Sequence, residues 1–270
     1  MEVITTIPGP LASSRAWRDH FWAKNRRHWR VVQAKEELKG GPADPPELTP
    51  EERDTISASI AQFQLGEGSQ GRRLLDRGRE WGKLAGDPDF ITALAEFITE
   101  EQKHSYLLGE FMDREGIPRL RRHWLDGVFR HLRVLGELEW AVTVLVSAEA
   151  IAIPYYRALR EATNSSRLRT LCNEILRDES EHLIYQGRTL ALVRGPENSL
   201  NWTAHRGLLE GTLCVVWAEH GRVFRRAGYS FARVRREARE AFDVLRSVSS
   251  ICHHSYRLEQ SPALRQGAPA

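Results

Sequence analysis

The stretch Glu174–Gln186, EILRDESEHLIYQ, places Glu179 and His182 three residues apart in a segment with the composition of a helix. Residues at positions i and i+3 lie on one face of a helix, so the two side chains can reach a common point. That point can be water, a neighbouring helix or a metal ion. One such pair does not choose among these, and the choice depends on the partners that the rest of the chain supplies.

The bulk composition bounds the class of protein. The 270-residue chain is 41% hydrophobic and 28% charged, with a formal net charge of +3, which permits an acidic partner but does not favour nucleic acid. The three cysteines lie far apart in the sequence, without the spacing of a metal motif or a disulfide framework. No secretory signal is evident, and the apolar runs are too short to span a membrane. We therefore expect a soluble, cytoplasmic protein.

Helix signals dominate the chain, and no segment alternates as a strand would. Thr49, Pro50 and Glu52 form a capping-box pattern, which predicts a helix that runs to about Leu84. Further helices are expected over residues 87–116, 126–161, 163–195, 200–226 and 231–257. The sequence thus predicts an all-α protein whose default architecture is a helical bundle.

The same signals divide the chain into four parts. Residues 1–48 form an N-terminal arm and linker, 49–195 the bundle, 196–258 C-terminal accessory helices, and 259–270 a disordered tail. The arm contains the segment RAWRDHFWAKNRRHWR, which we expect to be a helix packed on the body of the protein. Its aromatic side chains are too many to leave in water: Trp17, Phe21, Trp22 and Trp29.

A second Glu-x-x-His pair, Glu101 and His104, lies in the segment EEQKH. With 26 glutamates and 10 histidines, roughly one such pair is expected by chance, so two pairs alone establish little. Two further glutamates change this interpretation, because Glu67 precedes Glu101 by 34 residues and Glu149 precedes Glu179 by 30. The two halves of the chain therefore repeat the order Glu, then Glu-x-x-His, on four successive helices.

Glu149 is the most informative of these residues, because the segment from Ala141 to Ile153 is otherwise apolar. An ionised carboxylate buried without a partner is strongly unfavourable, and a cation in the core removes that penalty. Four carboxylates and two imidazoles suit a pair of divalent first-row ions, and neutral imidazole suits iron better than calcium or magnesium.

Over residues 49–194 this pattern resembles the di-iron carboxylate proteins of the ferritin-like superfamily. The resemblance implies a ferritin-like four-helix bundle, here with additional N-terminal and C-terminal helices. It implies two iron ions as cofactor, with a manganese–iron or manganese pair as the alternative, and O2 as co-substrate. The implied metal ligands are Glu67, Glu101, His104, Glu149, Glu179 and His182.

Members of the superfamily often carry an acid just before each Glu-x-x-His pair, hydrogen-bonded to the opposite histidine. Glu100 and Asp178 hold these positions, so the resemblance implies that they orient the two rings. Two plainer interpretations stay open: Glu67 lies on a solvated turn between glycines, and Glu100 is surface charge. The later histidines, His205, His220, His253 and His254, are expected to be structural or exposed.

The resemblance favours a non-haem di-iron oxidase or oxygenase that hydroxylates, desaturates or N-oxygenates an organic substrate. The spacing is similar to that of acyl-carrier-protein desaturases and multicomponent monooxygenase subunits. Leu108 stands where a ribonucleotide reductase small subunit has its radical tyrosine, and Ile175 where an N-oxygenase has a third histidine. The expected partners are a small or carrier-bound substrate and an external electron donor such as a reductase or ferredoxin, with a homodimer as a further possibility.

Two other functions stay open, a ferroxidase or other iron-handling protein and a non-enzymatic helical interaction protein. The segments before and after the bundle favour a substrate pocket, since a storage shell has no evident need for them. Candidate pocket side chains lie one or two turns from the ligands: Phe63, Phe97, Ile153 and Tyr156. Three small residues are expected to leave space beside them: Gly68, Gly71 and Ala152.

Overall fold

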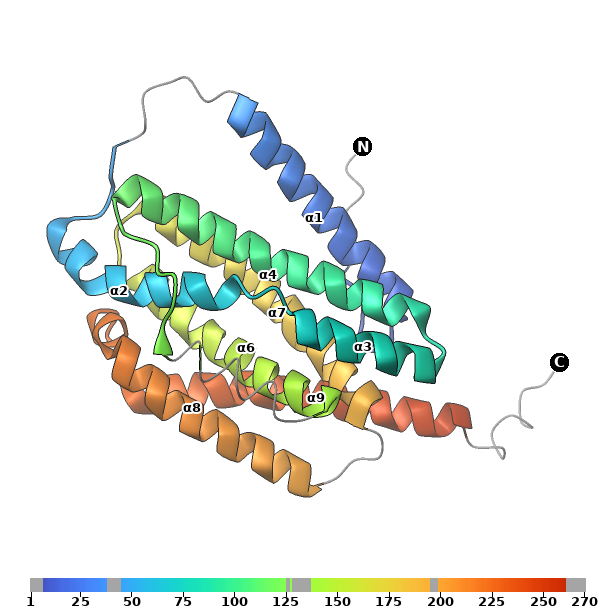
Figure 1. Ribbon diagram of the computed structural model, residues 1–270. Helices are drawn as coiled ribbons and strands as arrows, with labels where there is room; N and C mark the ends of the chain where they lie inside the picture. The colour runs from blue at the N-terminus through green and yellow to red at the C-terminus, as the bar shows by residue number, and fades with distance from the viewer. Residues whose placement is uncertain (1–6, 38–44, 125–126, 128–136, 195–198, 261–270) are drawn as a thin grey trace.

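The computed structural model describes residues 7–37, 45–124, 127, 137–194 and 199–260, and these contain helices and no strand (Figure 1). The prediction of an all-α protein is confirmed for this part of the chain. The helices are α1 (Ser14–Glu37), α2 (Pro50–Glu67), α3 (Arg72–Ala85), α4 (Pro88–Glu115), α6 (Leu138–Glu161), α7 (Ser166–Arg194), α8 (Ser199–Arg226) and α9 (Phe231–Gln260).

The capping box at the start of α2 forms as predicted. The Glu52 backbone N–H donates to Thr49 Oγ1 at 3.2 Å, and the Thr49 N–H donates to Glu52 Oε2 at 3.0 Å. The helix ends at Glu67, so the predicted single helix to Leu84 is wrong. Between α2 and α3 the backbone of Gly71 has a φ of +57°, outside the helical region, and a Cβ there would lie 2.5 Å from Ile98 Cδ1 of α4. Glu67 is therefore the last residue of α2 and does not lie within a longer helix.

The helix that carries Glu149 begins later than expected. Glu137 is extended, with φ −69° and ψ −176°, and α6 starts at Leu138. The rest of the predicted start, residues 126–136, lies outside the described residues except for residue 127. Helix α6 is long and apolar enough to cross a membrane, but 78% of its most apolar window is buried in the protein. This is consistent with the core helix of a soluble protein, and the cytoplasmic location stays a prediction.

Helices distant in sequence pack side by side around one core. Helix α2 packs on α4, α4 on α7 and α7 on α6, while α1 lies along α4 and both α8 and α9 cover α6 (Figure 1). The hydrophobic core runs without interruption from Trp17 in α1 to Leu245 in α9. The proposed parts of the chain do not have separate cores in this arrangement, and the boundaries between them stay a prediction.

Helix α1 confirms the expectation that the aromatic segment packs on the body. Trp17 and Phe21 are fully buried, as expected, because they lie four residues apart on the face toward α4 and α7. The expected burial of Trp22 is wrong, since it is 48% exposed. Arg26 lies over its ring, 4.9 Å from the ring centroid, and covers part of it.

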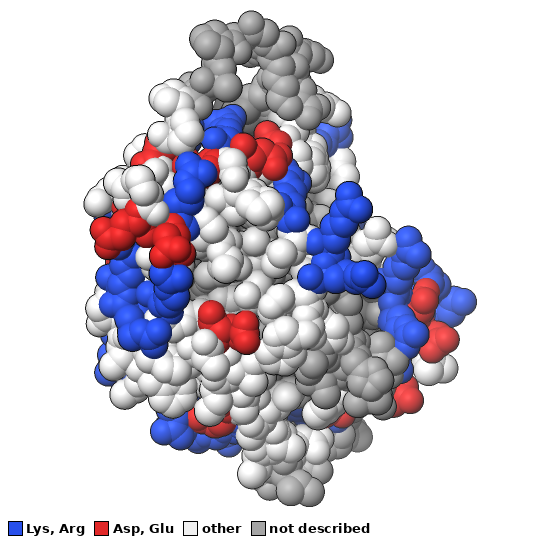
Figure 2. Space-filling model, turned by 60° about the vertical axis from the view of Figure 1, so that its left-hand side comes forward, with Lys and Arg blue, Asp and Glu red and all other residues white. Residues whose placement is uncertain are grey.

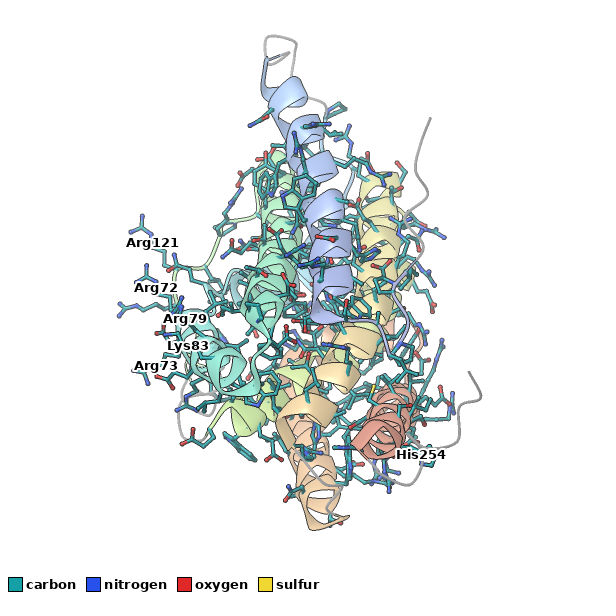
Figure 3. All side chains as sticks on the ribbon, turned by 90° about the vertical axis from the view of Figure 1, so that its right-hand side faces the viewer. Arg72, Arg73, Arg79, Lys83, Arg121 and His254 are labelled. Carbon is teal, nitrogen blue, oxygen red and sulfur yellow. The ribbon has the colours of Figure 1, made fainter. Side chains whose placement is uncertain are left out.

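Charges on the face shown in Figure 2 are intermixed. The face in Figure 2 carries basic and acidic side chains next to one another, and ion pairs such as Arg222–Asp54 and Arg226–Glu51 join α8 to α2. Helix α3 differs, because it contains five basic and two acidic residues. Figure 3 shows four of its basic side chains pointing away from the body: Arg72, Arg73, Arg79 and Lys83.

Candidate metal centre

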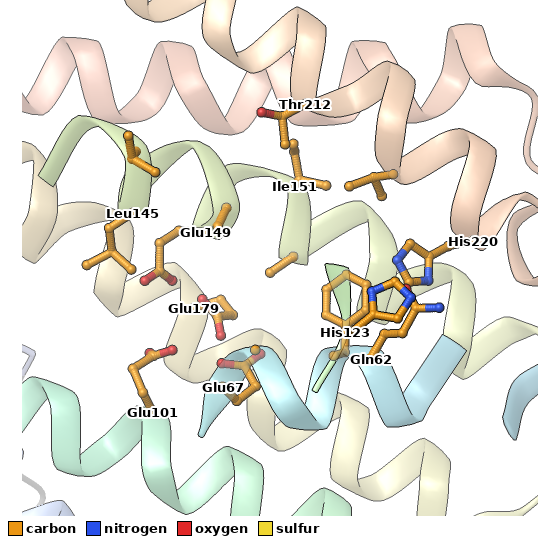
Figure 4. Close-up of a pocket in the computed structure, with 16 residues that line it drawn as sticks. Gln62, Glu67, Glu101, His123, Leu145, Glu149, Ile151, Glu179, Thr212 and His220 are labelled. Carbon is orange, nitrogen blue, oxygen red and sulfur yellow. The ribbon is translucent and has the colours of Figure 1, made fainter. Parts of the chain in front are cut away.

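Four helices bring the six predicted ligand residues to one place in the core. In Figure 4 the carboxylates converge from α2, α4, α6 and α7: Glu67, Glu101, Glu149 and Glu179. The solvated-turn interpretation of Glu67 does not hold, because its carboxylate lies in this cluster and accepts a 2.6 Å hydrogen bond from Tyr156 Oη. His104 and His182 are both fully buried beside the carboxylates.

The cluster consists of two overlapping groups. In each group, one potential ligand atom per residue lies within 4.8 Å of all the others. The first group is Glu67, Glu101, His104 and Glu179, and the second is Glu101, Glu149, Glu179 and His182. Glu101 and Glu179 belong to both groups, so two carboxylates lie between two positions, each of which has its own histidine and its own glutamate.

Glu179 shows this division most clearly, because its two oxygens face different histidines. Its Oε1 lies 3.5 Å from His104 Nδ1, and its Oε2 lies 3.4 Å from His182 Nδ1. A carboxylate placed in this way can bridge two ions, with one oxygen on each.

The inward-facing atoms of the cluster lack hydrogen-bond partners among the described residues. These buried atoms are Glu101 Oε1, Glu149 Oε1, both Glu179 carboxylate oxygens, His104 Nδ1 and His182 Nδ1. Glu101 Oε1 lies 2.8 Å from His182 Nδ1, and against the effect of burial this carboxylate raises the pKa of His182 well above its ordinary value. Buried polar atoms without partners are destabilising, and metal ions would satisfy all six. The donor set is therefore compatible with metal binding.

The outer nitrogen of each histidine is held by an acid from the opposite helix. His104 Nε2 lies 3.1 Å from Asp178 Oδ2, and His182 Nε2 lies 3.0 Å from Glu100 Oε2. Because Nε2 is engaged in this way, Nδ1 is left to face the centre of the cluster. Glu100 is fully buried, so the alternative that it is surface charge is wrong.

A lysine that sequence reasoning missed joins these two acids. Lys24 of α1 places its Nζ 2.8 Å from Glu100 Oε1, 2.9 Å from Asp178 Oδ1 and 2.6 Å from Glu181 Oε2. Burial opposes its charge, but the three carboxylates hold the pKa of Lys24 above its ordinary value. The sequence could have predicted that Lys24 faces the core, since residues 17, 21 and 24 share one helix face. The Arg-rich composition of the segment hid that signal.

The electrostatics of the cluster are those of crowded carboxylates. Burial and the neighbouring carboxylates raise the pKa of Glu67 and Glu179 well above the ordinary value and also raise that of Glu101. Burial also opposes ionisation of Glu149, but contacts with Glu179 and His182 lower its pKa. The metal-free cluster thus retains protons, which a bound cation would displace.

The acids that orient the rings behave in the opposite way. Burial opposes the charge of Glu100, yet His182 and Lys24 lower its pKa to about 2. His104, Lys103 and Lys24 likewise hold the pKa of Asp178 far below its ordinary range, against the effect of burial. Both groups are therefore carboxylates at neutral pH, able to accept the N–H of each ring.

A cavity of about 150 Å³ adjoins the carboxylates and is walled by α2, α4, α6, α7 and α8, with His123 of the α4–α6 connection (Figure 4). Of the predicted pocket residues, Phe63 and Ala152 line it. Phe97 instead packs edge-on against His182, with ring centroids 4.8 Å apart, and Ile153 is buried in the core outside the cavity walls. Tyr156 also lies outside these walls and contacts the site through Glu67.

The two glycines expected to leave space do not do so. A Cβ on Gly68 would lie 3.0 Å from Ser105 Oγ, and Gly71 is closer still to Ile98. These glycines permit close packing of the chain on α4, which places Glu67, and they do not enlarge the cavity.

The chain was compared with models of protein families, with curated proteins and with solved structures, and none of the three comparisons gave a match. The interpretation of the site therefore depends on the geometry described above.

We expect Lys24→Met to weaken metal binding by about 10- to 100-fold, the usual effect of losing a group that orients metal ligands. The reason is that Glu100 and Asp178 would lose the cation that holds them against the two rings. Zinc affinity measured by competition with a chelating dye tests this. Lys83→Met, on the exposed face of α3, is the matched control and should bind zinc as the native chain does. Equal affinity in all three proteins would contradict the positioning role of Lys24.

The stabilisation by metal should increase with pH. Folding raises the pKa values of Glu67, Glu101 and Glu179, so the folded state holds their protons more tightly than the unfolded state does. The stability that depends on these protons is fully present below about pH 4.5 and is lost as the pH rises through the pKa values of the folded state. Zinc displaces those protons, and its positive charge offsets the repulsion among the deprotonated carboxylates. The rise in melting temperature on adding zinc should therefore be larger at pH 8 than at pH 6, as measured by differential scanning fluorimetry. A rise that is independent of pH would refute this account.

Proposed function

We propose that this protein is a non-haem di-iron oxidase or oxygenase that oxidises a small organic substrate with O2, built on a ferritin-like arrangement of α2, α4, α6 and α7. The observation that carries the proposal is the sharing of Glu101 and Glu179 between two groups, each of which adds one glutamate and one histidine. Chance pairs of Glu-x-x-His on separate helices would not produce this symmetry.

Each position would have its own ligands. Glu67 and His104 would hold one ion, Glu149 and His182 the other, and the two shared glutamates both. Four carboxylates balance two divalent ions, and the mixed carboxylate–imidazole set suits iron, with manganese as the alternative. When bound, the metal pair would supply the redox chemistry that activates O2.

The chain's own residues would prepare the site for that chemistry. Glu100 and Asp178 accept the Nε2 protons of the two rings and so keep Nδ1 available. Tyr156 donates to Glu67 Oε1 and fixes the carboxylate at the end of α2. Lys24, whose side chain is 16% exposed, offsets the charge of the outer acids.

The cavity favours oxidation of an organic molecule over iron storage. Its lining includes four of the proposed ligands together with apolar side chains such as Val144 and Ile151. A store or ferroxidase requires a route for hydrated cations, which the apolar stretch of the wall between the carboxylates and His220 disfavours. The accessory helix α8, which follows the four ligand-bearing helices, supplies part of this wall, as expected if the accessory helices build a substrate pocket.

Oxygenase turnover needs two external electrons, and we propose a separate donor protein. Helix α3 presents its basic side chains close in sequence to the site, since Arg72 follows Glu67 by five residues. An acidic donor such as a ferredoxin would suit this face. Its rate of electron delivery should fall as salt rises, as followed by stopped-flow absorbance, and a rate independent of salt would contradict docking there.

Anaerobic iron loading followed by exposure to O2 tests the function. Two irons per chain and O2 uptake in proportion to added reductant are expected. Glu149→Ala and His182→Ala should lose both properties, whereas the exposed His254→Ala should retain them. Hundreds of irons per assembly would identify an iron store. A native chain that binds no metal would leave the helical interaction protein as the remaining interpretation.

A further inference from the structure

The cavity beside the carboxylates has a second polar end. At that end lie Gln62 of α2, His220 of α8 and His123, away from Glu101 and Glu149 (Figure 4). Apolar side chains form the wall between the two ends: Val144, Leu145, Ile151, Ala152 and Val216. A molecule in this cavity would therefore meet hydrogen-bonding groups at one end and the proposed metal ligands at the other.

A chain of hydrogen bonds sets the proton on His220. Its Nδ1 lies 2.9 Å from Ser59 Oγ, which lies 3.0 Å from Tyr155 Oη. Tyr155 is fully buried, and Ser59 is the only hydrogen-bond partner of its hydroxyl among the described residues. Since a buried O–H without an acceptor is unfavourable, Tyr155 donates to Ser59 and Ser59 donates to His220 Nδ1. The ring proton of His220 then lies on Nε2, the nitrogen available to a ligand in the cavity.

His220 is suited to bind a neutral or anionic oxygen without becoming charged. It is 2% exposed, and burial together with His123 lowers its pKa to about 4. It is therefore a neutral donor at pH 7. Gln62 adds a second group at the same end, because its Oε1 is buried and has no hydrogen-bond partner in the described part of the chain. An amide can turn to present either its oxygen or its N–H₂.

The dimensions of the cavity match a ligand with a single ring. A volume of about 150 Å³ is that of a cavity that holds one benzene molecule. Gln62 and Glu67 are five residues apart on α2, which corresponds to about 7.5 Å along the helix axis. A six-carbon body with one polar substituent spans this distance.

We propose that the cavity takes a benzene-sized apolar molecule with one carbonyl or carboxylate end, which His220 Nε2–H and the Gln62 amide bind while the apolar end faces the carboxylate cluster. That this molecule is the substrate rests on the proposed function. Its binding does not, because His220 and Gln62 are not metal ligands. His220 is thus a specificity-determining residue, where the sequence had indicated only a structural or exposed histidine.

Isothermal titration calorimetry of the full-length, metal-free protein with toluene, benzamide and benzoate tests the proposal. The three probes share a ring and differ in the polar end. Benzamide or benzoate should bind about tenfold more tightly than toluene, the effect of one added hydrogen bond. Preference for benzoate over benzamide would identify a carboxylate end, and the reverse an uncharged carbonyl. Equal binding of all three would overturn the proposal.

His220→Phe should abolish this preference and leave toluene binding unchanged, because it retains the ring contact with Phe63. His205→Phe is the control, a buried histidine of the same helix that does not line the cavity. Ala152→Leu should fill the cavity and remove binding of every probe. If His220→Phe fails to fold, Gln62→Leu provides the second variant, with a smaller loss of preference. A preference that survives both polar substitutions would refute the assignment.

The two proposals fail separately. If the chain binds no metal, the probe preference and its loss in His220→Phe are still measurable, and only the role of substrate is withdrawn. If the probes show no preference while iron loading and O2 uptake succeed, the oxidase stands and the polar end has no part in recognition.

Discussion

Repulsion among buried carboxylates is the constraint on which the rest of this structure depends. Glu67, Glu101, Glu149 and Glu179 meet in a core that is otherwise apolar, and their inward oxygens have few hydrogen-bond partners. Such a cluster is stable only if it retains protons or binds cations. The raised pKa values of three of the four describe the first state, and the convergent lone pairs make the second possible.

The surroundings of the cluster are organised to keep it in place. Lys24 and Lys103 balance the acids that hold the two histidines, and Lys24 comes from α1, a helix outside the four that carry the ligands. On the opposite side, α8 contributes Thr212, Val216 and His220 to the cavity, four residues apart on one face. The additional helices thus complete the site at both ends.

The groups that orient the histidines and the groups that line the cavity lie on opposite sides of the cluster. The orienting acids are ionised and lie on the α1 side, where charge is balanced by lysines. The cavity lies on the α8 side, where neutral groups and apolar walls predominate. The cluster therefore has a charged support on one side and a largely apolar cavity wall on the other, and the support fixes the orientation of the two histidines.

Much of this structure could be predicted from the periodic spacing of residues along the chain. An i, i+3 pair must share a helix face, so EILRDESEHLIYQ already placed Glu179 and His182 together, and the apolar run around Glu149 already required burial. The capping box and most helix limits follow from the same short-range rules. The end of α2 at Glu67 did not, because the close approach of Gly71 to Ile98 of α4 and its positive φ depend on tertiary packing.

Contacts between helices distant in the chain depend on packing, which periodicity does not describe. The bond from Lys24 to Asp178 spans 154 residues, and that from His220 to Ser59 spans 161. Phe97 and Tyr156 lie close to the cluster, but they contact His182 and Glu67 and do not line the cavity. The face of a helix on which a residue lies does not determine which neighbouring side chain that residue contacts. Spacing along a helix sets the direction of a side chain, and the packing of the helices sets what lies there.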